Sequence, residues 1–174
     1  MSQKIIVLSD GTRALPISRY RHPDFDVAST LTKNLACLSL PPVLEHIVKA
    51  TFDDDSFPKE KHVEYLIHAS FRQNIYPFHR ELISRLRTRQ YRIVFKTLLV
   101  IHRITRDGDL CAIRTFANQS SIFEKISTSF TDPHVFRQNN RFMKYISIIK
   151  IYAAYLYQKC LVYSAAGVSC EQQQ

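Results

Sequence analysis

Apolar residues recur along this chain at the spacing of one helix face. The stretch Tyr91–Arg106 goes further, because apolar side chains occupy nearly every side of it, which is typical of a helix buried among others. Helical spacing predicts further helices over about 43–51, 58–72, 78–88, 110–117, 122–127 and 135–163. Pro41 and Pro42 separate these from an earlier segment, and Gly108 is placed to end the central helix. We therefore expect an all-α fold of antiparallel helices stacked as a solenoid or bundle.

The same pattern divides the chain into three parts. Residues 1–26 contain scattered glycine and proline and a short strand signal at 5–8, so we expect an irregular leader. Residues 27–165 form the expected helical domain, and 166–174 form a short polar tail. No run of about 18 apolar residues is present, so no membrane-spanning helix is predicted. The apolar run near the N-terminus is too short for a signal peptide, which makes a cytosolic protein the default.

Composition narrows the function classes. The formal net charge of +9 indicates an anionic partner, either a membrane or a nucleic acid. With glycine only at Gly11, Gly108 and Gly167, the chain cannot build a phosphate-binding glycine loop or a serine-nucleophile elbow. The histidines lack zinc-protease spacing, and the cysteines form no C-x-x-C pair, so we expect reduced thiols. We expect a protein with no enzymatic activity, no cofactor and no metal ion.

A candidate anion site follows from the stretch Lys49–His62. It places three basic side chains at the start of a predicted helix, namely Lys59, Lys61 and His62. Ser56 and Pro58 are expected to mark the beginning of that helix. Free backbone N–H groups, the helix dipole and ammonium groups can all point at one phosphate there, and a short turn would bring Lys49 back towards them. Protonation of His62 near its ordinary pKa would strengthen the contact.

Two motifs are distinctive in the spacing of their residues. The first is K-A-T followed after six residues by P-K-x-K-H, at 49–62. The second is Y-R-I-V-F-K-T-L-L-V-I-H with a later glycine, at 91–108. Together they resemble the ANTH domain of endocytic clathrin-assembly adaptors, in the ENTH/ANTH superfamily, and the second is similar to that family's central helix. The resemblance covers roughly 42–163. It implies a right-handed solenoid of the ENTH, ANTH and VHS type, of which this chain carries the first part only.

The resemblance also implies a phosphoinositide-binding endocytic adaptor module. In the family, the basic residues of the first motif hold the phosphates of phosphatidylinositol 4,5-bisphosphate, which here implies Lys49, Lys59, Lys61 and His62. The module would dock on the inner leaflet of the plasma membrane at clathrin-coated pits or vesicles. Its implied partners are clathrin coat proteins or ENTH-domain co-adaptors, although no N-P-F or D-P-F tripeptide is present.

Two acidic features depart from the family pattern. Glu60 stands where a further lysine often occurs, and Asp53–Asp55 adds an acidic run to the loop. Together, these four acidic residues outnumber the three lysines of the stretch. An anion site here therefore depends on geometry and not on bulk charge.

Some family members also insert an amphipathic segment into lipid ahead of the first solenoid helix. In this chain the segment would be 27–40, with its apolar face formed by Val27, Leu31, Leu35 and Leu38. The alternative is that this segment simply packs on the solenoid.

A second basic cluster offers an alternative function. Eight basic residues lie between Arg80 and Arg106, and Lys96 and Arg103 share a helix face there. This surface would suit a helical peptide- or nucleic-acid-binding module, such as the related type that binds the RNA polymerase tail. The first motif argues against this alternative and makes a nucleic-acid partner the weaker choice. His102, on the central helix, is expected to be a core histidine with a hydrogen-bond partner.

Overall fold

The computed structural model describes residues 6–7, 13–14, 41–71, 76–132 and 143–166. Seven helices lie within these ranges: α2 (Pro42–Ala50), α3 (Glu60–Ser70), α4 (Tyr76–Leu86), α5 (Tyr91–Asp107), α6 (Leu110–Ala117), α7 (Ser121–Ser129) and α8 (Met143–Ala165). A two-residue strand, β1 (Ile6–Val7), pairs antiparallel with β2 (Arg13–Ala14). The helical fold class is confirmed, and the strand signal at 5–8 corresponds to β1.

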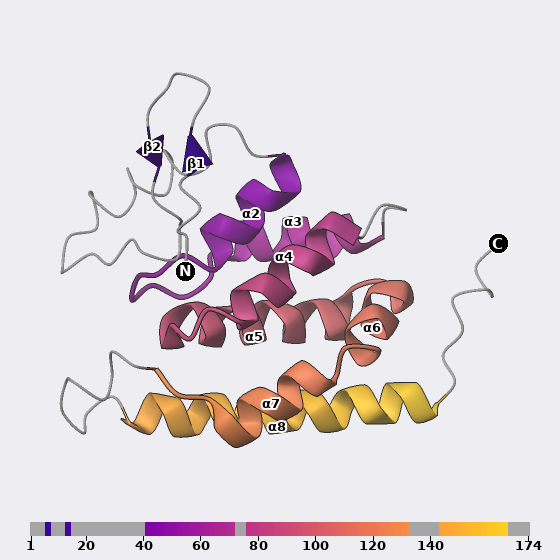
Figure 1. Ribbon diagram of the computed structural model, residues 1–174. Coiled ribbons are helices and arrows are strands. Elements are labelled where there is room, and N and C mark those ends of the chain that lie inside the picture. The colour runs from indigo at the N-terminus through magenta and orange to yellow at the C-terminus, as the bar shows by residue number, and fades with distance from the viewer. Residues whose placement is uncertain (1–5, 8–12, 15–40, 72–75, 133–142, 167–174) are drawn as a thin grey trace.

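The helices stack in tiers around α5. Figure 1 shows α2, α3 and α4 on one side of α5, and α7 with α8 along the opposite side. α5 packs against α3 and α4 in the first tier and against α8 in the other. Every tier therefore rests on this helix, as the apolar character of 91–106 predicted.

Burial of α5 explains its sequence. Ile93 is 1% exposed, and Leu98 and Ile101 are 0% exposed, so apolar side chains on different sides of the helix are all removed from water. Its buried polar residues, Lys96, Thr97 and Thr105, are hydrogen-bonded. A helix that packs against two tiers buries a wide apolar arc, while Arg103 and Arg106 occupy its partly exposed side.

Gly108 ends α5 because no side chain fits there. Its φ of −97° is ordinary, so a left-handed conformation is not the reason. A Cβ would lie 2.6 Å from the Ile104 carbonyl oxygen and 2.7 Å from Ser70 Oγ. The Ser70 hydroxyl donates to the Ile67 carbonyl at 2.6 Å and accepts from the Asp109 N–H at 2.9 Å. This contact ties the end of α3 to the turn that begins α6.

The long helix α8 buries only one of its faces. Ile146, Ile149, Ala153 and Leu156 are buried in the core, while Ile148, Ile151, Tyr155 and Val162 are exposed on other sides. Cys160 lies in the buried set, and burial raises the pKa of its thiol to about 11, so it is an unreactive packing group. None of the helices in the described ranges has the length and apolar character needed to cross a bilayer.

Several predictions lie outside the described residues. They concern the segment 27–40 with Val27, Leu31, Leu35 and Leu38, most of the leader 1–26, the tail beyond residue 166, and the first residues of the helix expected over 135–163.

Replacing Leu98 by alanine should lower the free energy of unfolding by about 2–5 kcal/mol. Leu98 is 0% exposed at the centre of α5, so its loss removes buried apolar surface and leaves a cavity. Urea unfolding followed by circular dichroism measures the change, with exposed Val162→Ala on α8 as the control. A change no larger than that of the control would contradict the central position of α5.

Candidate anion-binding site

Three lysines and a histidine meet where α2 ends and α3 begins. Lys49 lies in the last turn of α2, Lys59 is the N-cap residue of α3, and Lys61 and His62 lie in the first turn of α3. The two helices pack against each other, and the positive charges of all three lysines act on His62. The residues selected by the first motif therefore lie together in space.

The start of α3 differs from the prediction. Lys59 occupies the N-cap position with extended backbone and no capping side chain, and Glu60 is the first helical residue. The expectation that Ser56 caps this helix is wrong, because its hydroxyl and its N–H both donate to the Asp54 carboxylate, at 2.6 and 3.1 Å. The N–H of His62 already donates to the Lys59 carbonyl at 2.9 Å. The N–H groups that precede it in α3, with no capping side chain, are the ones that suit an external phosphate oxygen.

His62 lies beneath the lysines and is only 8% exposed. Burial, followed by the neighbouring His46 and the lysines, lowers its pKa to about 4. The expectation that His62 titrates near its ordinary value is therefore wrong, since the ring is neutral between about pH 5.5 and 7.5. Its Nδ1 lies 3.2 Å from Nδ1 of His46, a residue of α2 that the sequence motif does not include.

The acidic run of the loop is bound to α5. Arg92 lies 2.7 Å from Asp55 through Nε and 3.7 Å from Asp53 through Nη1. Lys96 forms an ion pair with Asp54 and donates to the Phe52 carbonyl at 2.8 Å. These contacts place two positive charges beside the three carboxylates and hold the loop against the central helix, so most of the negative charge of the Asp53–Asp55 run is paired.

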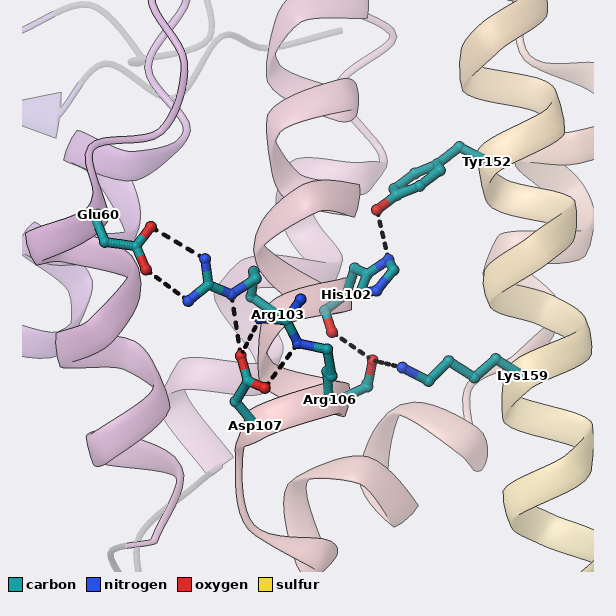
Figure 2. A network of polar contacts seen from close by, with 8 residues as sticks. Glu60, His102, Arg103, Arg106, Asp107, Tyr152 and Lys159 are labelled. Atoms are coloured by element: carbon teal, nitrogen blue, oxygen red, sulfur yellow. Dashed lines mark hydrogen bonds and ion pairs between the residues drawn. The ribbon is translucent and has the colours of Figure 1, made fainter.

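Glu60 is held in the same way. Arg103 of α5 donates to both oxygens of its carboxylate, at 2.6 and 3.1 Å, and to Asp107 at 3.1 Å (Figure 2). Arg106 also binds Asp107, and its hydrogen bond, with that of Arg103, lowers the pKa of this carboxyl to about 2. A bidentate guanidinium pair of this kind fixes both position and charge. Glu60 therefore carries a bound countercharge, even though it stands between Lys59 and Lys61 in the sequence.

The site lysines are paired differently. Lys49 forms an ion pair with Glu45, one turn earlier on α2. Lys59 and Lys61 are exposed, and no carboxylate of the described residues lies within ion-pairing distance of either. These two lysines carry the positive charge that an anion would meet first.

The second basic cluster does not form a free basic surface. Five of its eight members lie in ion pairs with carboxylates: Arg85, Arg92, Lys96, Arg103 and Arg106. The seven-residue spacing of Lys96 and Arg103 does place them on one face, but that face binds the loop and the start of α3. This arrangement favours a structural role over a nucleic-acid surface.

A pocket of about 280 Å³ lies beside this network. Its apolar walls include Phe57, Val63 and Leu99, and its polar lining includes His102 and Tyr152. The Tyr152 hydroxyl lies 2.6 Å from Nδ1 of His102 (Figure 2), so the expected partner for this histidine is present. The pocket contains none of the four motif residues, and Arg103 and Arg106 on its edge are already paired.

The helical fold and the lysines gathered where α2 meets α3 define a class of protein, a helical module with a cationic cluster at the junction of two helices. Residues 43–174 match the ANTH domain, and the chain belongs to this family. The resemblance drawn from the two motifs is confirmed. The phosphatidylinositol-binding clathrin assembly protein LAP of Drosophila melanogaster is 29% identical over 128 residues. The match covers 68% of this chain and 27% of that protein, so the chain spans about a quarter of its relative's length.

Replacing Lys96 by methionine should lower the free energy of unfolding by about 3–5 kcal/mol, since it removes one partner of a buried ion pair. Lys96 is 6% exposed, and methionine keeps much of its volume while Asp54 and the Phe52 carbonyl lose a donor. The exposed Lys125→Met variant is the matched control, and urea unfolding measures both. Equal stability of the two variants would show that α5 does not anchor the loop.

Proposed function

We propose that this chain is a phosphoinositide-binding endocytic adaptor module. It docks on the inner leaflet of the plasma membrane, at clathrin-coated pits or vesicles, through Lys49, Lys59, Lys61 and His62. The bound headgroup is that of phosphatidylinositol 4,5-bisphosphate. The chain acts by binding and not by catalysis.

One observation carries the proposal. Lys59 and Lys61 stand exposed at the start of α3 without a carboxylate partner among the described residues, while α5 binds the four nearby acidic groups. The local field is therefore positive where the sequence alone shows an excess of acidic residues. Ammonium groups, N-terminal amides and the helix dipole act on one bound phosphate from the same direction.

Family membership supports the membrane as the source of that phosphate. The relative LAP is described as a phosphatidylinositol-binding clathrin assembly protein. By extension, this chain would organise or recruit a clathrin coat, with coat proteins or ENTH-domain co-adaptors as partners. Its surface lysines attract the anionic leaflet, and the interaction weakens as salt screens the charges.

Replacing Lys59 and Lys61 together by glutamate should weaken vesicle binding at least about thirtyfold, since each basic residue near an anionic leaflet contributes about 1 kcal/mol. Co-sedimentation with phosphatidylcholine vesicles carrying phosphatidylinositol 4,5-bisphosphate measures the affinity. The matched control reverses two exposed lysines elsewhere, Lys125 on α7 and Lys144 on α8.

The control carries the same change in net charge, so it should bind nearly as the parent does. Circular dichroism checks that both variants keep their helices. If the two double variants bind the vesicles equally well, the protein binds the membrane through its overall charge and the proposed site is wrong.

Replacing Arg103 by glutamine should weaken vesicle binding by about two- to fivefold, although Arg103 lies outside the motif. The substitution releases Glu60, whose negative charge then opposes the phosphate between Lys59 and Lys61. Arg114→Gln changes the net charge equally at an exposed position of α6 and should leave the affinity near that of the parent. If both variants lose the same affinity in the same vesicle assay, Arg103 does not act by holding the negative charge of Glu60 away from the phosphate.

A further inference from the structure

A second histidine lies directly against the motif histidine. Nδ1 of His46 and Nδ1 of His62 are 3.2 Å apart, and the two rings meet edge to face with centroids 4.9 Å apart. The His46 ring also stacks on Tyr65 of α3, with centroids 3.8 Å apart and planes 20° from parallel. This stacking holds the plane of His46, so its Nδ1 stays directed at His62.

The Nδ1–Nδ1 contact restricts the protonation of both rings. A neutral imidazole carries one N–H, so one ring must donate through Nδ1 and the other must accept. The accepting ring then carries its proton on Nε2, and the donating ring has a bare Nε2. When the pair gains one proton, a single N–H still bridges the rings and both Nε2 atoms become donors. Only this cationic form offers an anion two imidazole N–H groups.

The surroundings of the two histidines favour their neutral forms. Burial is the main cause that lowers the pKa of both histidines, and Lys49 and Lys61 lower it further, with Lys59 acting on His62 as well. Glu45 alone acts in the opposite direction on His46, and it is bound to Lys49. A phosphate that binds to the lysines brings negative charge and reverses their effect, so it raises the affinity of the pair for a proton.

We propose that His46 is a fifth member of the anion site and shares a proton with His62, so that the pair gains one proton when a phosphate group binds. The inference rests on the proposed function, and it adds a residue and a linkage to the same site. Because the bound form holds more protons than the empty form, binding strengthens as the pH falls from about 7.4 to about 6. The phosphate's own protonation opposes this trend equally in every variant.

Isothermal calorimetry with inositol 1,4,5-trisphosphate, the soluble headgroup, tests the proposal. Titrations at about pH 6 in two buffers of different ionisation enthalpy give the number of protons taken up on binding. His46→Phe keeps a flat ring against Tyr65 and removes the shared nitrogen. His68→Phe is the matched control, because His68 is an exposed histidine on the same helix as His62.

The parent and the His68 variant should take up protons equally, whereas the His46 variant should lose most of the uptake and show a flatter pH profile. Equal uptake by the His46 variant overturns the inference while leaving the proposed function intact. If the parent protein binds neither the headgroup nor the vesicles at about pH 7.4 or about pH 6, the inference and the proposed function are both wrong. Inorganic phosphate in place of the headgroup distinguishes the two sources of the anion, and binding as tight as that of the headgroup would count against a lipid ligand.

Nitrogen-15 spectra of the parent's imidazoles provide a second test that does not require the His46 variant to fold. A shared proton makes both rings titrate together, and adding headgroup shifts both to a higher apparent pKa. If only His62 responds, His46 is not part of the site.

Discussion

The proposed anion site depends on the contacts that the buried ammonium group of Lys96 makes. This group projects from the central helix α5 and binds the Phe52 carbonyl and Asp54 in the loop between α2 and α3. A charge removed from water needs partners close by, so the loop must follow a path that supplies them. Because this loop joins α2 to α3, the contacts fix the segment between Lys49 and Lys59 against the central helix.

Arg92 and Arg103 extend the same principle along α5. Each binds acidic residues that lie near the lysines in the sequence, so the central helix holds that negative charge in ion pairs. The net charge of +9 does not show where the surface is positive, because several basic residues lie beside carboxylates and others do not. The local arrangement of a few charges, and not their sum, decides where an anion would bind.

The pair formed by His46 and His62 shows how burial changes the chemistry of a motif residue. Among three lysines, a histidine that keeps its ordinary pKa would add one more repelling charge as the pH falls. Burial is the main cause that lowers the pKa of both rings, whose Nδ1 atoms lie 3.2 Å apart. Neutral rings therefore avoid adding positive charge beside the lysines.

The sequence by itself determined the helical class, the central position of Tyr91–Arg106 and the family, because helical periodicity and motif spacing are local properties of the chain. It also selected Lys49, Lys59, Lys61 and His62, which the fold brings together. It did not identify His46, which lies 16 residues from His62 and belongs to no motif. It also could not show how the acidic residues are paired, since their partners, which bind Asp54, Asp55 and Glu60, lie 37 to 43 residues away. Only the tertiary structure decided these points, because ion pairing and burial depend on which distant segments the packing brings into contact.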